Sequence, residues 1–461
     1  MKIHTVESIY YNKSECIFDL LLSPPDLGRE FIIGRSNYEQ IYRLAAGIKH
    51  LKLSSSVDRG LVCLCTSNKT LITASIIASL AGGPLLVLPY IFSRQVIEEV
   101  CNTLSPSVLI TDRSSDLPMG YPVFTPSMLQ SDSMSFEPLI VPDDPLLMLF
   151  TGGSTGKPQV YVKTLRNLLG EAWFHSKKFG IDRNDIFLST ASPQHIYGLL
   201  FSILIPLVSS SRVLEGIFSF PREILRTARR HKATVLVGVP PCFRVMKIND
   251  LHKYNLRMAF SSAGKLQEED AEYFHDKTGL EITDIYGSTE TGGVATRSCP
   301  VDKSWTPLDV VEWKITDGRL LIRSPFLSPG LPRCDKGFFV TADSATYEGD
   351  NKFILQGRVD DVIKIGGKKV DLTVVKSQLK QIHGVRDAVV VSFLTKDGHQ
   401  NEISALVVTD LNMNELRRQM AMVSELHAIP KRIVIVREIP ITSTGKYDRQ
   451  EIDLILQSSK R

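Results

Sequence analysis

The chain has 461 residues, of which 43% are hydrophobic and 23% charged, and this composition is typical of a globular protein with two or three domains. A formal net charge of +4, spread evenly along the chain, is too small to indicate a nucleic-acid-binding protein. Seven scattered cysteines, with no C-x-x-C pair and no Cys/His spacing for zinc, exclude a zinc module and indicate reduced cytoplasmic thiols.

The first residues, Met1 to Glu7, contain no apolar signal core. Residues 71–90 could be mistaken for a membrane span, but Gly82, Gly83 and Pro84 divide them into a helix of about a dozen residues and a short strand. Neither part reaches the roughly 20 helical residues that cross a bilayer. We therefore expect no membrane span and a cytoplasmic protein.

Strand and helix patterns alternate through the first 290 residues, which is typical of a doubly wound, mostly parallel sheet. Cys63 and Cys65 alternate on one of these strands and should share a buried face. The expected strands are 61–65, 85–88, 107–111, 145–150, 186–190 and 234–239, with further strands beginning at 258 and 281. The expected helices are 38–51, 70–81, 93–103, 167–179, 221–231 and 267–278, and an apolar run covers 199–208.

The pattern changes after residue 306. Short alternating strands at 320–323, 337–340 and 352–355 predict a small β-barrel or sheet. Helices at 372–382 and 412–426 and strands at 388–392, 403–408 and 433–436 follow. The predicted fold is α/β: a large N-terminal domain (1–357) of doubly wound sheets plus a small β-barrel, then a smaller, mobile α+β domain (358–461).

A glycine-rich segment, Thr151 to Gly156, follows the apolar strand 145–150. Glycines allow a ligand to approach the backbone closely, and hydroxyl and N–H groups in such a turn can surround a phosphate. The G-x-x-x-x-G-K-[ST] spacing of a Walker loop is absent. On its own, the segment is equally compatible with a Gly/Ser turn between two strands.

Three further polar segments also follow expected strands: the segment around His195, the turn Ser261 to Gly264, and the turn Tyr286 to Glu290. In open α/β sheets, ligands bind beyond the carboxyl ends of the strands. We therefore expect these segments and the glycine-rich segment to meet in one crevice.

Five motifs, in this order, resemble those of the adenylate-forming superfamily, which comprises AMP-forming acyl- and aryl-CoA synthetases, luciferases and the adenylation domains of peptide synthetases. Residues 151–159 are similar to T-S-G-S-T-G-x-P-K, and 286–290 match Y-G-x-T-E. Asp343 stands where the family has the acidic residue of T-G-D. Residues 357–364 match G-R-x-D-D-x-I-K, and 442–449 match T-x-x-G-K-x-x-R.

The resemblance implies a ligase with two half-reactions. A carboxylate attacks the α-phosphate of ATP and gives acyl-AMP and pyrophosphate; a thiol then displaces AMP to give a thioester. The implied cofactors are ATP, Mg²⁺ and coenzyme A, or the phosphopantetheine of an acyl carrier protein. The implied substrate is a small carboxylic acid, and no nucleic acid is expected.

The resemblance also implies roles for individual residues. Lys446 reaches the carboxylate and the bridging oxygen in the first step, Thr289 contacts the α-phosphate, and Glu290 binds Mg²⁺. Asp343 accepts hydrogen bonds from the ribose with help from Arg358. The remaining nucleotide- and cofactor-binding residues are Thr151, Gly152, Gly153, Ser154, Thr155 and Gly156 on the pyrophosphate side; Tyr286 on adenine, with Gly287 and Ser288; Ser262, Ala263 and Gly264 on the other side of adenine; Gly366 and Gly367 at the pantetheine tunnel; and Asp360 as a hinge.

The acid pocket follows from the same resemblance. His195 lines the crevice between the acyl and CoA sites, and we place it among the catalytic residues. Amino-acid-activating relatives have an aspartate after this position, whereas this chain has Ile196, so we expect an aryl or medium aliphatic acid without an α-amine. The other expected pocket residues are Tyr197, Gly198, Val239, Gly287, Gly292 and Gly293.

Two departures leave alternatives open. Gln159 stands where the family has a lysine, although Lys157 or Lys163 could supply the cation, and residues 371–376 lack the family's glutamates. The segment 195–200 and the short chain resemble ligases of aryl-polyene clusters, which suggests a carrier protein as acceptor. Gln159 also leaves open a nucleotide-binding relative without catalysis.

Overall fold

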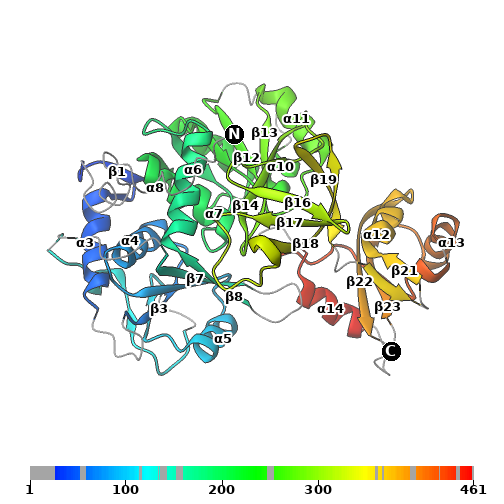
Figure 1. The fold of residues 1–461 in the computed structure, drawn as a ribbon, viewed down its shortest axis with the longest axis horizontal. Helices are drawn as coiled ribbons and strands as arrows, with labels where there is room; N and C mark the ends of the chain where they lie inside the picture. Colours follow the sequence, from blue (N-terminus) through cyan, green and yellow to red (C-terminus); the bar gives the residue numbers. More distant parts are fainter. Residues whose placement is uncertain are drawn as a thin grey trace. The chain divides into compact units, whose positions relative to one another are not determined.

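A computed structural model describes residues 26–51, 59–113, 117–132, 134, 136, 143–151, 159–246, 254–358, 362–365, 368–394, 401–424, 426–442 and 447–458 (Figure 1). The chain forms two compact units. The first comprises residues up to 312 together with 323–339, and the second comprises 313–322 and 340–461.

The first unit contains a six-stranded sheet. Its strands, in spatial order, are β6 (Val123–Phe124), β5 (Val108–Thr111), β3 (Leu61–Cys65), β4 (Leu85–Pro89), β7 (Pro145–Thr151) and β8 (Gln159–Thr164). Neighbours from β6 to β7 are parallel, and β8 returns antiparallel along β7. The sheet therefore brings the carboxyl ends of β4 and β7 to the same edge.

A nine-stranded sheet forms the rest of the first unit. In spatial order it contains β15 (Thr306–Pro307), β14 (Gly292–Cys299), β13 (Ile282–Ser288), β12 (Met258–Ser261), β11 (Val235–Val237), β9 (Ile186–Ser189), β10 (Arg212–Leu214), β1 (Glu30–Ile33) and β2 (Ser36–Asn37). The strands from β13 to β1 are parallel to their neighbours, and β14, β15 and β2 are antiparallel.

Helices cover both faces of both sheets, which gives five layers (Figure 1). The helices are α3 (Tyr38–Lys49), α4 (Lys69–Leu80), α5 (Arg94–Leu104), α6 (Glu171–Lys178), α7 (Ile196–Leu199), α8 (Ile205–Ser209), α9 (Pro221–His231), α10 (Pro240–Val245) and α11 (Glu268–Thr278), with short helical turns at Pro126–Met128 and Asp335–Gly337. The central layer shares one core with the inner faces of both sheets, and α4 is buried on all sides within this layer.

Helices on the far faces of the two sheets form the outer layers. α5 packs on the far face of the six-stranded sheet, where the Sγ atoms of Cys63 and Cys65 lie 3.8 Å apart, so their predicted shared buried face is confirmed. α9, α10 and α11 cover the far face of the nine-stranded sheet, because their apolar residues form one core with it.

Residues 166–209 differ from the expected single helix and apolar run. The helix predicted at 167–179 consists of a π-helical segment, Arg166–Gly170, followed by α6. The apolar run divides into α7, a π-helical segment Leu200–Leu204, and α8, which has Pro206 in its first turn. Proline lacks a backbone N–H and is tolerated there, because the first N–H groups of a helix have no partner within it.

The second unit contains the short sheet β16 (Glu312–Thr316), β17 (Arg319–Arg323), β18 (Phe339–Glu348) and β19 (Lys352–Arg358) and the hairpin β20 (Val362–Ile365) and β21 (Lys368–Asp371). A three-stranded sheet of β22 (Val385–Leu394), β23 (Asn401–Thr409) and β24 (Arg432–Ile435) follows. The helices are α12 (Leu372–Gln381), α13 (Met413–Val423) and α14 (Arg449–Ser458), with a turn at Leu426–Ala428. α12 and α13 cover one face of that sheet, and α14 packs on the other.

The predicted α/β fold with a large N-terminal and a small C-terminal part is confirmed, and the alternating strands around 312–358 form an open four-stranded sheet. Contacts group this sheet with the C-terminal residues, whereas we expected it in the large domain. The domain boundary at about 357 and the hinge at Asp360 both stay predictions.

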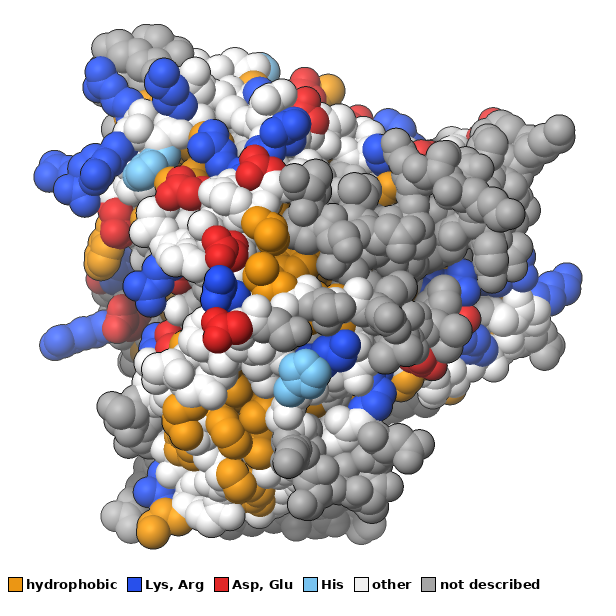
Figure 2. All heavy atoms as spheres, turned by 90° about the vertical axis from the view of Figure 1, so that its left-hand side faces the viewer, with side chains coloured by type: hydrophobic (Ala, Val, Ile, Leu, Met, Phe, Trp, Pro, Cys, Tyr) orange, Lys and Arg blue, Asp and Glu red, His pale blue; other side chains and the backbone are white. Residues whose placement is uncertain are grey.

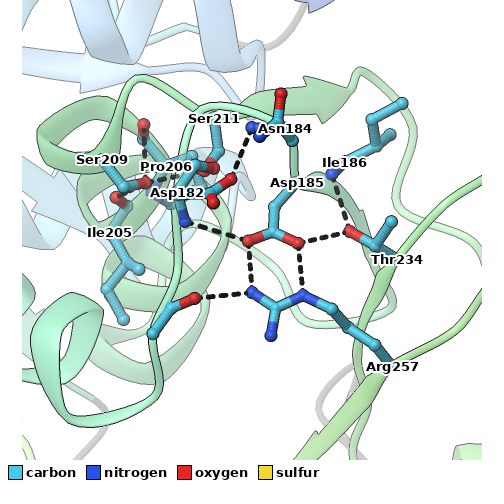
Figure 3. A network of polar contacts seen from close by, with 11 residues as sticks. Asp182, Asn184, Asp185, Ile186, Ile205, Pro206, Ser209, Ser211, Thr234 and Arg257 are labelled. Carbon is cyan, nitrogen blue, oxygen red and sulfur yellow. Dashed lines mark hydrogen bonds and ion pairs between the residues drawn. The ribbon is translucent and has the colours of Figure 1, made fainter.

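A buried aspartate anchors the amino-end edge of the nine-stranded sheet (Figure 3). Asp185, just before β9, accepts hydrogen bonds from Arg257 at 2.5 and 2.7 Å, from the Thr234 hydroxyl at 2.7 Å and from the Asp182 N–H at 3.0 Å. Burial alone would raise the pKa of Asp185, but these hydrogen bonds and the Arg257 charge hold it below its ordinary value of 3.8. The ionised carboxylate therefore stabilises the folded state.

We expect Asp185→Asn to lower the free energy of unfolding by about 2–3 kcal/mol at pH 7, because an amide cannot accept all these hydrogen bonds. A carboxylate with a lowered folded pKa stabilises the protein above its unfolded pKa, and this contribution is lost as pH falls below 3.8. The cost of the substitution, measured by urea unfolding, should shrink over that range. Asp143→Asn is the control, because Asp143 makes the same two contacts with Arg166 at the surface. An equal cost for both variants would contradict the argument.

The surface is mixed in charge. Figure 2 shows a face on which basic and acidic side chains lie among each other, with hydrophobic side chains between them. None of the helices in the described part of the chain combines the length and apolarity that a membrane crossing needs.

Candidate functional site

Four neighbouring parallel strands of the nine-stranded sheet, β13, β12, β11 and β9, end at the same edge. The segments that follow these ends contain His195, Val239, Ser262 to Gly264, and Thr289 to Glu290. The structure therefore brings together these predicted site segments, as the strand-end argument anticipated.

The His195 segment connects this edge to the other sheet. His195 stands immediately before α7, and its N–H donates to the Ser192 carbonyl at 3.2 Å. The Gln194 amide donates to the carbonyl of Pro89, at the carboxyl end of β4, at 3.4 Å. Pro89 is in register with Phe150 of β7, so the strand that leads into the glycine-rich segment ends beside the His195 segment.

The loop after β12 is held in a specific conformation. The Ser262 hydroxyl donates to the Ile285 carbonyl of β13 at 2.8 Å. Ala263 has φ of +72°, a left-handed conformation that is unfavourable for a residue with a Cβ. Such strain costs of order 1–3 kcal/mol and is concentrated at functional sites.

The turn that connects β13 and β14 contains Thr289 and Glu290 and is fixed from both sides. The Ser288 and Thr291 hydroxyls lie 2.9 Å apart, and the Ser288 N–H donates to the Thr291 hydroxyl at 2.9 Å. The Glu290 carbonyl accepts from the Ser328 N–H at 2.8 Å. These contacts fix the backbone of the turn. They do not involve the side chains of Thr289 and Glu290, which we expect to bind phosphate and metal.

Tyr286 is supported by a row of side chains. Its ring centroid lies 5.6 Å from that of Trp305, on which the Arg297 guanidinium stacks at 4.6 Å. Arg297 donates to Asp284 at 2.7 and 3.0 Å. Burial raises the pKa of Asp284 to about 6 despite this cation. The row positions the ring that we expect to contact adenine.

The expected acid pocket is built from close backbone contacts. A Cβ on Gly198 would lie 1.9 Å from the Ser192 carbonyl oxygen, and one on Gly287 would lie 2.3 Å from that of Gly292. Only glycine permits these approaches. The buried Tyr197 hydroxyl donates to the Gly238 carbonyl at 3.0 Å, beside Val239. Tyr197 therefore holds the end of β11 through its only polar group.

A cluster of buried ionisable residues, Lys163, Glu171 and His175, lies next to Gly292 and Gly293. Glu171 accepts from the Gly293 N–H at 2.6 Å, and its Oε1 lies 3.6 Å from His175 Nε2. Oε2 of Glu171 and both ring nitrogens of His175 have no hydrogen-bond partner in the described part of the chain. Lys163 is fully buried, and its ammonium donates to the Phe326 carbonyl at 3.3 Å.

Burial and two neighbouring carboxylates determine the pKa of Lys163. Burial lowers the pKa of Lys163 to about 8, and the charges of Glu171 and Glu290 oppose this shift. From the sequence, Lys163 was expected only as a substitute for the cation missing at Gln159, and Glu171 and His175 were not expected at the site. The i,i+4 spacing of Glu171 and His175 on α6 is a signal, but the same spacing is equally common on exposed helix faces.

Asp343 and Arg358 belong to the second unit, where they lie directly opposite each other on β18 and β19. The Asp343 N–H donates to the Thr341 hydroxyl at 3.2 Å. The structure therefore pairs the two residues that we expect to contact the ribose.

Several predicted residues lie outside the described residues: Gly152, Gly153, Ser154, Thr155, Gly156, Asp360, Gly366, Gly367 and Lys446. Thr151 and Gln159 flank the first of these segments and are paired across β7 and β8. The Gln159 amide oxygen accepts from the Tyr161 hydroxyl, so it has a partner within the sheet. Within the described residues, no group of three or more His, Cys, Asp or Glu side chains could hold a metal ion.

Comparison with known proteins assigns the family. The family model described as AMP-binding enzyme matches residues 34–330. The chain belongs to the AMP-binding enzyme family. This family assignment confirms the resemblance to adenylate-forming proteins.

Relatives within the AMP-binding family are distant. The chain is 27% identical to acetyl-coenzyme A synthetase 2 of Saccharomyces cerevisiae over 67% of its own length and 54% of the relative's. It is 26% identical to anthranilate–CoA ligase of Pseudomonas aeruginosa over 66% and 65%, and 23% identical to 3-hydroxybenzoate–CoA/4-hydroxybenzoate–CoA ligase of Thauera aromatica over 78% and 76%. The chain thus spans about half the length of the acetyl-coenzyme A synthetases that it matches.

Solved structures of the same architecture cover nearly the whole chain. ATP-bound MatB from Rhodopseudomonas palustris has a TM-score of 0.80 at 18% identity and covers 96% of this chain and 98% of its own. A benzoate CoA ligase from Burkholderia xenovorans has a TM-score of 0.76 at 20% identity and covers 95% and 99%. At these identities the likeness establishes the fold.

Proposed function

We propose that this protein activates a carboxylic acid with ATP, giving an acyl-adenylate and pyrophosphate, and then transfers the acyl group to the thiol of coenzyme A. The observation that carries the proposal is the shared edge of four parallel strands, where the His195 segment, the Ser262–Gly264 loop and the Thr289–Glu290 turn lie together. The relatives named as CoA ligases support the reaction class.

The first half-reaction develops charge on phosphoryl oxygens, so the protein has to supply positioning and electrostatic stabilisation. In this proposal Thr289 donates to the α-phosphate, and Tyr286 and the Ser262–Gly264 loop bind adenine from opposite sides. Asp343 accepts from the ribose hydroxyls, with Arg358 beside it, and Lys446 neutralises the carboxylate and the bridging oxygen. The fixed backbone of the Thr289–Glu290 turn suits this task, because it needs no reorganisation during the reaction.

Magnesium fits this site as an ion shared with the nucleotide. The described residues offer no complete set of protein ligands, and Mg²⁺ is commonly bound by one or two carboxylates together with substrate phosphates. Glu290 is the carboxylate that we assign to it, and the ion would neutralise phosphate charge.

We propose an aryl or medium aliphatic acid without an α-amine as substrate. Ile196, directly after His195, offers no carboxylate to an ammonium group. The left-handed Gly292 and the closely packed Gly198 and Gly287 fix the backbone of these segments, and both an aryl and a medium aliphatic acid are compatible with them. Two of the relatives are named for aromatic acids, which is consistent with this choice.

ATP–pyrophosphate exchange with a panel of acids tests the proposal. Benzoate, anthranilate, the hydroxybenzoates, acetate, octanoate and several amino acids make up the panel, and thioester formation with coenzyme A is measured for each active acid. We expect exchange with an aryl or aliphatic acid and none with amino acids. Exchange with no acid would favour a non-catalytic nucleotide-binding relative, for which Gln159 is the argument. Thioester formation only with a carrier protein would favour the alternative acceptor.

A further inference from the structure

Four polar side chains follow one another at intervals of four residues from the end of β8 to α6: Lys163, Asn167, Glu171 and His175. Each of them is at most 5% exposed. Side chains of these types are rarely buried so completely unless they have partners. Asn167 also lies within the π-helical segment Arg166–Gly170, and such segments occur frequently at functional sites. The burial of this row therefore has to be explained by its partners.

The first two members of the row hold a segment of the chain that follows β17. The Asn167 amide donates to the carbonyl of Pro325 at 2.8 Å and to that of Leu327 at 3.2 Å. The Lys163 ammonium donates to the carbonyl between them, that of Phe326, at 3.3 Å. Three successive carbonyls are therefore fixed by side chains from a distant part of the sequence.

The third member holds the start of β14. Glu171 Oε1 accepts from the Gly293 N–H at 2.6 Å. Gly292 packs directly against the same carboxylate, because a Cβ on Gly292 would lie 2.6 Å from Glu171 Oε2 and 2.7 Å from the Phe326 Cβ. Glu171 and Phe326 thus form a cradle that only a glycine fits.

Both of these segments adjoin the turn that contains Thr289 and Glu290. On one side the turn leads directly into Gly292 and Gly293. On the other side the Ser328 N–H, at the end of the first segment, donates to the Glu290 carbonyl at 2.8 Å. The row therefore fixes the turn through two separate sets of contacts.

Stability alone does not explain the row. Replacing a buried charged group and its partner by apolar side chains is often neutral or stabilising. A buried hydrogen bond provides what apolar packing does not, because it fixes the position and direction of the backbone group that it binds. The turn has such a requirement, since phosphoryl transfer depends on positioning and a displacement of about 1 Å can lower a rate about 100-fold.

We infer that Asn167 and Glu171 are positioning residues for adenylation, which hold the backbone of the Thr289–Glu290 turn in the place that the ATP phosphates require. This inference rests on the proposed function. Neither residue contacts the substrate; both act through the backbone of the turn. The first half-reaction depends on this turn most strongly, whereas the second starts from an acyl-adenylate that has already lost pyrophosphate.

A pair of substitutions separates the hydrogen bond of Glu171 from its charge. Glu171→Gln and Glu171→Met both remove the carboxylate charge beside Lys163, but only the glutamine can still accept from the Gly293 N–H. Asn167→Leu independently removes the two bonds to the other segment. Asp185→Asn is the control for lost stability, because Asp185 lies at the amino-end edge of the sheet, opposite the turn. Should Glu171→Met fail to fold, Lys163→Met is added to both Glu171 variants, since it removes the uncompensated ammonium.

Four measurements are made on each variant. ATP–pyrophosphate exchange at varied Mg²⁺ concentration gives the kcat and the half-saturating Mg²⁺ concentration of the first half-reaction. Conversion of synthetic acyl-adenylate to the coenzyme A thioester gives the second half-reaction. Calorimetric titration with ATP, with the acid omitted and in the presence of either Mg²⁺ or EDTA, gives binding without turnover. Urea unfolding gives the folded fraction under assay conditions.

We expect Glu171→Met and Asn167→Leu each to lower the kcat of exchange about tenfold or more and to raise the half-saturating Mg²⁺ concentration. Conversion of acyl-adenylate should change much less. Glu171→Gln should retain most of the kcat that Glu171→Met loses, and Asp185→Asn should keep wild-type kinetics per folded molecule.

Equal losses for Glu171→Gln and Glu171→Met, equal losses in both half-reactions, or an unchanged Mg²⁺ requirement would overturn the inference. If the wild type adenylates no acid, the proposed function fails and the titrations decide the inference. The preference for ATP with Mg²⁺ over ATP with EDTA should then shrink in Glu171→Met and Asn167→Leu, but not in Glu171→Gln. An unchanged preference, or no binding of ATP by the wild type, would overturn the inference as well.

Discussion

Replacing Lys446 with alanine is expected to slow acyl-adenylate formation by about 100-fold or more, the scale of removing one well-placed electrostatic contact. Lys446 lies outside the described residues, and its role follows from the matching motif around it. A lysine ammonium is a mobile point charge, suited to oxygens whose charge changes during phosphoryl attack. If the C-terminal residues move away after adenylation, Lys446 is not needed for thiol transfer, and a supplied acyl-adenylate should still be converted to thioester.

Both half-reactions are measured on one purified variant, with ATP–pyrophosphate exchange for the first and thioester formation from synthetic acyl-adenylate for the second. Lys431→Ala is the control, because this exposed lysine also lies in the second unit. Retained exchange would remove Lys446 from the site. Loss of both steps in a folded protein would contradict a mechanism in which the lysine acts only in the first.

Glu171→Gln is expected to lower the free energy of unfolding by about 3 kcal/mol at pH 7, because it removes a charge that offsets the buried Lys163 ammonium. The amide oxygen can still accept from the Gly293 N–H, so the effect reports charge rather than a lost hydrogen bond. Between pH 8 and 10.5 the unfolded chain binds more protons at Lys163 than the folded chain does, so this contribution to stability rises with pH. In the Glu171→Gln variant the pKa of Lys163 falls further. The loss in free energy of unfolding that the substitution causes should therefore be smaller at pH 9 than at pH 6.

A double-mutant cycle isolates this interaction. Lys163→Met in the Glu171→Gln background removes the buried ammonium, so the double variant should recover much of the loss. Urea unfolding at pH 6 and pH 9 gives the four free energies. A cost that is the same at both pH values, or that is simply additive with Lys163→Met, would show that the two charges do not interact.

The helices that could be predicted from the sequence are those whose ends and apolar spacing are visible in the local sequence. α9 begins at Pro221 and follows the apolar spacing 224, 225, 228, so its bounds coincide with the prediction, and α4, α5 and α11 agree within one residue. The π-helical turns at 166–170 and 200–204 could not be predicted, because five residues are too few for side-chain periodicity to distinguish a π-helix from an α-helix. The pairing of β1 with β10 joins segments nearly 180 residues apart, and no local pattern encodes it.

Only part of the candidate site could be predicted from the sequence. The strand-end rule placed His195, Ser262 and Glu290 at one edge, because parallel strands end together. The buried cluster of Lys163, Glu171 and His175 was not anticipated, because charged residues are expected at the surface unless a tertiary partner compensates them. Such partners, here Phe326 and Gly293, are distant in sequence and become visible only in three dimensions.

The chain crosses between its two compact units three times, after residues 312, 322 and 339. β17 therefore belongs to an early part of the chain but pairs with the later β18 in the four-stranded sheet. A single cut between 323 and 339 would leave β16 and β17 on the amino-terminal fragment and β18 and β19 on the other, and the sheet would still hold the fragments together. The pairing of β17 with β18 thus joins the parts of the chain on either side of this segment without a covalent bond.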